Sequence, residues 1–185
     1  LEKIMTGCSQ TGAQHLPKTA GYSGVTMCHM MLPQDTNPAG IVHVGVVLKH
    51  IDDAAGVVAL RHTRCSVVTA SIDRLDFHNP AFIGNLLSLK ASLNLVGTSS
   101  MEVGVRVETE DLKTGEIRHT ASAYLTFVAL DDQFHPRPVP PLVLETDEDR
   151  RRNRQAQARR RVRLAEKSRE TSCRTDPEAC QTPPD

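Results

Sequence analysis

The chain contains few aromatic residues: its 185 residues include no Trp, two Tyr and four Phe. Proteins that bind single-stranded nucleic acid use aromatic side chains as stacking platforms, so this scarcity argues against that class. The sequence also lacks any run near the roughly 18 apolar residues of a membrane-spanning helix. Residues 1–24 contain no signal-peptide core. We therefore expect a cytoplasmic protein with no membrane partner.

Neither sign of charge is in excess, because Lys+Arg and Asp+Glu both number 22. No global field therefore directs the chain to nucleic acid or to a membrane surface. Cysteines are odd in number and form no C-x-x-C pair, which favours free thiols in a reducing compartment. The five are Cys8, Cys28, Cys65, Cys173 and Cys180.

Hydrophobic periodicity predicts one helix followed by a run of strands. Residues 1–24 have no periodicity and are expected to be a disordered extension. The helix is expected over residues 43–61, after a first strand at 25–33 and a turn at 34–40. Strict alternation of apolar and polar residues, which buries one face of a strand, marks the later segments. These strands are expected at 66–72, 86–96, 101–109 and 119–131. The order favours an α+β domain with one helix wrapped by an antiparallel sheet.

The C-terminal part of the chain differs in composition. "PRPVPP" at 136–141 ends the sheet, and residues 145–170 read as a polar helix in which Thr146 can cap the first turn. This helix has ten basic and six acidic residues. It could contact phosphate groups of a ligand or nucleic acid, but a solvated helix along an oligomer surface is the favoured interpretation. Residues 171–185 are expected to be a disordered tail.

Two adjacent carboxylates lie in the middle of the predicted helix. Asp53 shares a polar stripe with Lys49, since helix neighbours are three and four residues apart. Asp52 shares the apolar stripe with Leu48, Ala55 and Ala59. An isolated charge in an apolar setting costs several kcal/mol. A functional carboxylate would explain Asp52, but so would a wet groove or an ion pair with an arginine.

The start of the helix, "NPAGIVHVG" at 37–45, is a candidate oxyanion site. Free N–H groups at a helix N-terminus attract developing negative charge. Asp52 lies nine residues beyond His43, or about 13 Å along a helix. One helix therefore cannot bring both features to one carbonyl group. Two antiparallel helices side by side could, which favours a dimer with a shared site.

These motifs resemble a known family. The pattern N-x-x-G-x-x-H-x-G, followed by L-K-x-I-D, A-G and R-H, is similar to the hotdog-fold acyl-CoA thioesterases of the cytosolic acyl-CoA hydrolase group. The resemblance runs from about Val25 to Lys167 and includes "VVTASIDRLDF", "GTSSMEVGVRVETEDLKTG", "ASAYLTFVALD" and "VPPLVLETDEDRRR". It implies a hotdog domain over residues 25–144, with a central helix wrapped by a five- to six-stranded antiparallel sheet. A basic C-terminal helix over 145–170 follows.

The resemblance also implies an activity: hydrolysis of fatty acyl-CoA to free fatty acid and CoA. Asp52 would activate the attacking water, and Asn37 of the partner subunit would position the water or the thioester. The implied oxyanion and substrate-binding residues are His43, Val44 and Gly45. The implied CoA-binding turn is Gly97, Thr98, Ser99 and Ser100. No metal and no separate cofactor are implied, because coenzyme A belongs to the substrate. The subunits would form dimers, and trimers of dimers.

One departure from the family pattern defines an alternative function. Val44 stands where the family usually has glycine, and a valine side chain could crowd the thioester. The chain could therefore be a non-catalytic hotdog that binds acyl-CoA as a sensor or scaffold. A nucleic-acid binder that uses residues 150–169 ranks third.

Overall fold

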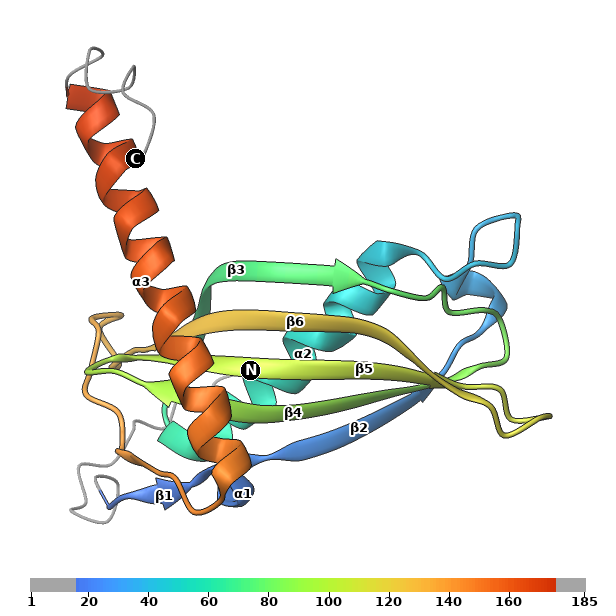
Figure 1. Ribbon diagram of the computed structural model, residues 1–185, viewed down its shortest axis with the longest axis horizontal. Helices are drawn as coiled ribbons and strands as arrows, with labels where there is room; N and C mark the ends of the chain where they lie inside the picture. Colours follow the sequence, from blue (N-terminus) through green and yellow to red (C-terminus); the bar gives the residue numbers. More distant parts are fainter. Residues whose placement is uncertain (1–15, 176–185) are drawn as a thin grey trace.

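A long helix packs against one face of an antiparallel sheet in the computed structural model, which describes residues 16–175 (Figure 1). In chain order the elements are β1 (Lys18–Thr19), α1 (Ala20–Ser23), β2 (Val25–Met30), η2 (Pro33–Asp35), α2 (Val44–Thr63), β3 (Val67–Phe77), β4 (Leu86–Val96), β5 (Ser100–Glu110), β6 (Ile117–Ala129), β7 (Leu142–Val143) and α3 (Asp147–Thr175). Five strands form the main sheet in the order β2-β4-β5-β6-β3, while β1 and β7 pair separately. The predicted hotdog architecture is confirmed, with a five-stranded sheet.

The alternation predicted from the sequence places the core on one face of this sheet. Every neighbouring pair of strands in the main sheet is antiparallel. Successive side chains point to opposite faces, so the apolar residues of each strand share one side. The buried apolar residues of β4, β5 and β6 on this side are Leu87, Leu89, Ala91, Leu93, Met101, Val103, Val105, Val107, Ala121, Ala123, Leu125, Phe127 and Ala129.

Helix α2 fills the concave side of the sheet with one apolar stripe. Its 20 residues span about 30 Å, which is close to the length of the strands that it crosses. Val47, Ile51 and Val58 are buried on this stripe, together with the small residues Ala54 and Ala55. Small side chains allow the helix backbone to approach the sheet closely. The helix ends at Thr63, and the C-cap residue Arg64 adopts a left-handed conformation with φ 57°.

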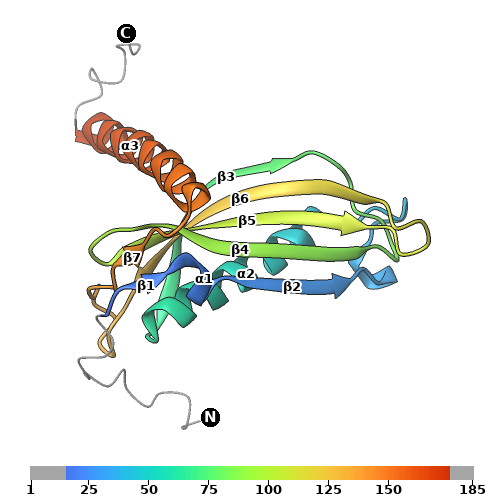
Figure 2. The same cartoon turned by 60° about the horizontal axis from the view of Figure 1, so that its bottom comes forward.

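Helix α3 lies on the opposite face of the sheet from α2 (Figure 2). Its first turn is a capping box: the Asp149 N–H donates to Thr146 Oγ1 and the Thr146 N–H donates to Asp149 Oδ2, both at a distance of 3.0 Å. The predicted cap is therefore confirmed. The helix continues to Thr175, so the first five residues of the expected tail are helical. Residues 176–185 lie outside the described part of the chain.

A buried ion pair helps to attach α3 to the sheet, close to Ala156, the fully buried residue of this helix. Glu102 is only 3% exposed and accepts hydrogen bonds from Arg159 Nη2 at 2.6 Å and from Asn94 Nδ2 at 3.1 Å. The Arg159 guanidinium also lies over the Tyr124 ring, 3.6 Å from its centroid. A Cβ atom at Gly104 would lie 2.5 Å from Asn94 Nδ2, so this contact requires glycine. Most of α3 is exposed, as expected of a solvated helix, while Arg159 and Ala156 face the sheet.

The residues directly before β2 form regular secondary structure. Residues 18–23, which were expected to belong to a disordered extension, form β1 and α1, while residues 1–15 lie outside the described part. Ser23 Oγ lies 3.1 Å from His62 Nδ1, and His62 Nε2 lies 2.9 Å from the Pro140 carbonyl oxygen. Since Nε2 must donate to that carbonyl, Nδ1 of the neutral imidazole accepts a hydrogen bond from the Ser23 hydroxyl. The imidazole thus ties α1, α2 and the segment before α3 together.

The cysteines only partly match the expectation of free thiols. Cys28 is free and exposed, but Cys65 is disulfide-bonded, so the expectation is wrong for Cys65.

Among the helices of residues 16–175, none combines the length and the apolar character needed to cross a bilayer.

The buried imidazole of His62 makes stability depend on pH. Its pKa lies below the usual value because burial penalises the charged form. Below about pH 6.5 the unfolded chain therefore binds more protons than the folded chain. The contribution of neutral His62 is complete above that pH and is lost as the pH falls toward the folded-state pKa. We expect the free energy of unfolding, measured in urea, to fall between pH 7.5 and 5, and to fall less in His62→Gln. Equal pH slopes in the two proteins would contradict this assignment.

Candidate active site

Asn37 forms a tight turn ahead of α2. Its side-chain Oδ1 accepts hydrogen bonds from the N–H groups of Ala39 at 3.0 Å and Ile41 at 3.1 Å. Its backbone N–H donates to the Ile41 carbonyl at 2.9 Å, and Gly40 completes the turn with φ 75°. Because both contacts use Oδ1, the Nδ2 group is the part of the amide left to contact a ligand. Asn37 can therefore act on a ligand as a hydrogen-bond donor.

The first turn of α2 presents unpaired N–H groups. His43 occupies the N-cap position, its side chain makes no capping hydrogen bond, and its backbone N–H donates to the Asp35 carbonyl at 2.9 Å. The N–H of Val46 donates to the His43 carbonyl, so those of Val44 and Gly45 precede the first hydrogen bond of the helix. No acidic residue lies in this turn. The positive end of the helix dipole is therefore open to an anion or a developing oxyanion.

Val44 does not obstruct this turn within one chain. Its side chain is 56% exposed. A Cβ atom built at Gly45 would have no neighbour within 4 Å, so the space around Gly45 is open. The residue that departs from the family pattern thus points away from the protein core.

Asp52 is half-buried and bound to β3. Its Oδ1 accepts a hydrogen bond of 2.7 Å from the Thr69 hydroxyl, which leaves Oδ2 available. Asp53 is exposed and forms a weak ion pair with Lys49 at 3.8 Å. The two adjacent carboxylates therefore point in different directions, as helical geometry predicts. Asp52 is the one turned toward the sheet.

Asn37 and Asp52 do not meet within one chain. They are separated by the straight first half of α2, and nine residues of helix between His43 and Asp52 correspond to about 13 Å. Strand β3, which carries Thr69, is an edge strand of the sheet. It exposes three large apolar side chains, those of Val68, Ile72 and Phe77.

The predicted CoA-binding turn lies between β4 and β5, under α3. The Gly97 N–H donates to the Ser100 carbonyl at 2.7 Å, which closes the turn. The Thr98 carbonyl accepts a hydrogen bond from the Val139 N–H, and the Ser99 carbonyl accepts one from the Ala129 N–H, both at 2.9 Å. The guanidinium group of Arg160 lies 3.2 Å from the position of a Cβ atom at Gly97. A basic side chain from α3 therefore reaches a turn that has none of its own.

An apolar cavity of about 330 Å³ opens beside the start of α2. Val44 and Val47 of the helix line one side, and Phe77, Ala81 and Thr120 line the other. The cavity lies next to the unpaired N–H groups of Val44 and Gly45. An apolar space therefore adjoins groups that can polarise a carbonyl oxygen.

Thr69 is the site residue that sequence reasoning missed. It lies in an alternating stretch, but β3 has register shifts between Thr69 and Ser71 and between Ile72 and Arg74. Such bulges redirect side chains, so alternation alone could not show which strand residue faces Asp52.

Among residues 16–175, no group of three or more His, Cys, Asp or Glu side chains is arranged to hold a metal ion.

Comparison with known proteins identifies the family. Residues 39–116 match the thioesterase superfamily. A cytosolic acyl coenzyme A thioester hydrolase of Mus musculus is 35% identical over 136 residues, which are 72% of this chain and 36% of that protein. An uncharacterized acyl-CoA thioester hydrolase of Bacillus subtilis is 43% identical over 127 residues, 69% of this chain and 74% of that protein. The chain thus spans 36% of the length of the mouse relative.

Solved structures agree with this relationship. A hexameric acyl-CoA thioesterase is 38% identical, with a TM-score of 0.79 over 82% of this chain and 97% of that one. An acyl-CoA hydrolase from Staphylococcus aureus, solved with butyryl coenzyme A and coenzyme A, is 35% identical, with a TM-score of 0.78 over 89% and 99%. The fold is that of a hotdog domain of the thioesterase superfamily. Within it, the chain belongs to the family of acyl-CoA thioester hydrolases.

The turn at Asn37 yields a prediction for stability. Asn37→Ala removes the acceptor of two N–H groups, so we expect the free energy of unfolding to fall by about 1 kcal/mol. Asn37→Asp keeps the acceptor and should remain close to wild type. Urea denaturation of the three proteins at pH 7.5 measures this difference. Equal stability of Asn37→Ala and wild type would show that the Oδ1 hydrogen bonds do not support the turn.

Proposed function

We propose that this protein hydrolyses acyl-CoA thioesters to a free acid and coenzyme A. The observation that carries the proposal is the half-buried Asp52 carboxylate, held by Thr69 with one oxygen left available. A carboxylate in this setting is suited to accept a proton from water. The relatives support the substrate class, since they are named acyl-CoA thioester hydrolases.

The spacing of three residues supports the assignment of roles. The S. aureus hydrolase was solved with alanine in place of an asparagine, of an aspartate 15 residues later and of a threonine a further 17 residues on. Asn37, Asp52 and Thr69 have the same residue types at the same spacings. Asn37 and Asp52 are therefore our proposed catalytic pair, with Thr69 as the residue that positions Asp52.

The reaction begins with water attacking the thioester carbonyl carbon. Asp52 Oδ2 takes the proton of that water, and the electrons of the C=O bond move to its oxygen. The N–H groups of Val44 and Gly45 stabilise the resulting oxyanion, since they lie at the positive end of a helix dipole. Asn37 Nδ2 donates to the thioester or to the water. The tetrahedral intermediate then expels the thiolate of coenzyme A, which takes up the proton held by Asp52 and leaves as the thiol, so that Asp52 is a carboxylate again.

Each site is completed by a second subunit. The carboxylate and the helix start of one chain are too far apart to act on one carbonyl group. The open edge of β3 can pair with β3 of another copy, which would cover Val68 and Ile72. A two-fold arrangement of this kind runs the two α2 helices antiparallel and brings Asp52 of one chain toward Asn37 of the other. Three such dimers would form a hexamer, the state named for a structural neighbour.

A non-catalytic acyl-CoA-binding protein is the alternative function. It depends on Val44 crowding the thioester, and the exposed Val44 side chain lines the cavity at the start of α2. Saturable acyl-CoA binding without thiol release in the wild-type protein would favour this alternative. Nucleic-acid binding by residues 150–169 has less support, because five of the ten basic residues already form ion pairs. A cytoplasmic location remains part of the proposal, in keeping with the name of the mouse relative.

Substitution of the two adjacent carboxylates tests the assigned base. We expect Asp52→Asn to lower kcat about 100-fold or more, which is the usual contribution of a general base. Asp53→Asn is the matched control on the same helix and should stay near wild type. Thr69→Val removes only the positioning hydrogen bond and should lower kcat about tenfold. Thiol release from butyryl-CoA measures all four proteins, and full activity of Asp52→Asn would exclude the mechanism.

Mixing two inactive variants tests whether the site is shared. Asp52→Asn and Asn37→Asp each damage a different half of it. In a mixed dimer, one of the two sites combines two intact halves. Random co-refolding should therefore restore about a quarter of the wild-type activity. No recovery, despite mixed dimers seen by mass spectrometry, would mean that both residues act within one chain.

A further inference from the structure

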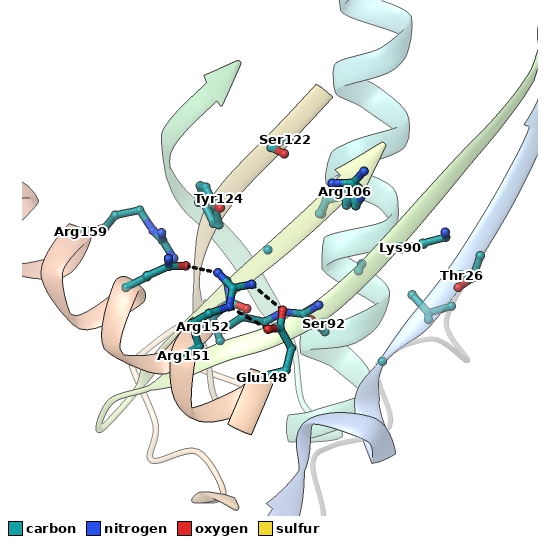
Figure 3. A pocket seen from close by; sticks show the side chains of 17 residues that line it. Thr26, Lys90, Ser92, Arg106, Ser122, Tyr124, Glu148, Arg151, Arg152 and Arg159 are labelled. Atoms are coloured by element: carbon teal, nitrogen blue, oxygen red, sulfur yellow. Dashed lines mark hydrogen bonds and ion pairs between the residues drawn. The ribbon is translucent and has the colours of Figure 1, made fainter. Parts of the chain in front are cut away.

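A second, polar cleft lies between the outer face of the sheet and the first half of α3 (Figure 3). It has a volume of about 520 Å³, and β2, β4, β5, β6 and α3 all contribute to its wall. None of Asn37, Asp52 or Thr69 lines it. This cleft is therefore separate from the proposed catalytic residues within one chain.

Positive charge gathers on both walls of this cleft. The basic residues that line it are Lys90, Arg106, Arg151, Arg152 and Arg159, and the acidic one is Glu148. Figure 3 shows that the arginines of α3 and the basic side chains of the strands come from different sides of the space. Arg159 forms an ion pair with the buried Glu102, which leaves four basic groups at the opening of the cleft.

These four cations share two carboxylates. Lys90 and Arg106 both contact Glu108, at 2.6 and 2.7 Å. Arg151 and Arg152 both contact Glu148, at 2.6 and 2.8 Å. Each pair of cations therefore has one carboxylate between them, so two positive charges at the opening are not balanced by the residues that the structure describes.

Both carboxylates are ionised at neutral pH, so each of them cancels one positive charge and the excess in the cleft stays at two. Hydrogen bonds from Lys90 and then Arg106 lower the pKa of Glu108. A hydrogen bond from Arg151, followed by that from Arg152, lowers the pKa of Glu148 to about 2.

The strand side of the cleft has an unfavourable charge pair. Lys90 and Arg106 are directly opposite each other on β4 and β5. Like charges in this cross-strand position destabilise a sheet. Their side chains remain about half exposed, so they are accessible to an incoming group. A bound anion would relieve the repulsion that Glu108 only half neutralises.

The chemistry of the lining selects the class of ligand. Arginine forks match the oxygen geometry of phosphate, and charge-assisted hydrogen bonds of this kind are strong. A phosphate group carries about two negative charges at neutral pH, which equals the excess in the cleft. We propose that this cleft binds a small phosphate-bearing molecule between Lys90 and Arg106 of the sheet and Arg151 and Arg152 of α3. The ligand would bridge the sheet and the helix.

Titration with pyrophosphate tests the proposal. Calorimetry of the full chain, at constant ionic strength set with chloride, should show saturable binding. Arg106→Gln combined with Arg151→Gln removes one cation from each wall and should weaken binding at least about tenfold. Arg154→Gln is the control, because Arg154 is exposed on the same helix and does not line the cleft. It should bind like wild type. Circular dichroism and gel filtration confirm that each variant keeps its fold and its assembly.

Three outcomes would overturn the proposal. The first is the absence of saturable binding to the wild-type protein. The second is an equal loss of affinity in Arg154→Gln, which would indicate non-specific attraction. The third is a double variant that binds pyrophosphate normally but changes its oligomeric state, which would make the cleft an interface between copies of the chain.

A competition experiment identifies the source of the phosphate. Pyrophosphate is titrated again in the presence of saturating coenzyme A. Competition would mean that the cleft holds the phosphates of coenzyme A, and independent binding would mean that it holds a separate phosphate compound. Both results support the site. Since binding is read without turnover, the result does not depend on the proposed hydrolysis.

Discussion

The rest of the structure depends on the burial of one stripe of α2 against the sheet. Val47, Ile51 and Val58 occupy this stripe, and together they set the rotation of the helix about its axis. That rotation determines the surroundings of both neighbouring carboxylates. Asp52 falls at the border of the stripe and reaches the hydroxyl on β3, whereas Asp53 is turned to solvent. The apolar core thus determines which of the two carboxylates faces the sheet.

Polar contacts hold the parts of the molecule that the core does not reach. At the start of α2, the Asn37 carboxamide supports the turn through one of its atoms and leaves the other available. At the far end, His62 connects the helix to chain segments before β2 and after β6. On the other face of the sheet, α3 is attached by the pairing of Arg159 with Glu102 and of Arg163 with Asp73. Ion pairs thus contribute to the attachment on the outer face of the sheet, whereas apolar packing covers the inner face.

Much of the fold could be predicted from the sequence, because it follows from local periodicity. Alternation identified the inward residues of β4, β5 and β6, and helical spacing separated Asp52 from Asp53. The contact of Thr69 with Asp52 could not be predicted, since bulges in β3 break the alternation that would have placed it. The docking of α3 was also missed. Its anchors join charged residues more than 50 positions apart, and a basic helix looks the same in sequence whether it is solvated or paired.

The close approach at Gly104 makes the outer face of the sheet intolerant of substitution. Even the smallest side chain there would displace the Asn94 amide, which donates to Glu102. Glu102 would then lose one of the groups that compensate its buried charge, and the arginine from α3 would lose its alignment. A change of one methyl group in the middle of β5 would thus be transmitted to a helix that is distant in sequence. Variation among homologues that keep this attachment should accordingly avoid this position while tolerating replacements at the exposed end of α3.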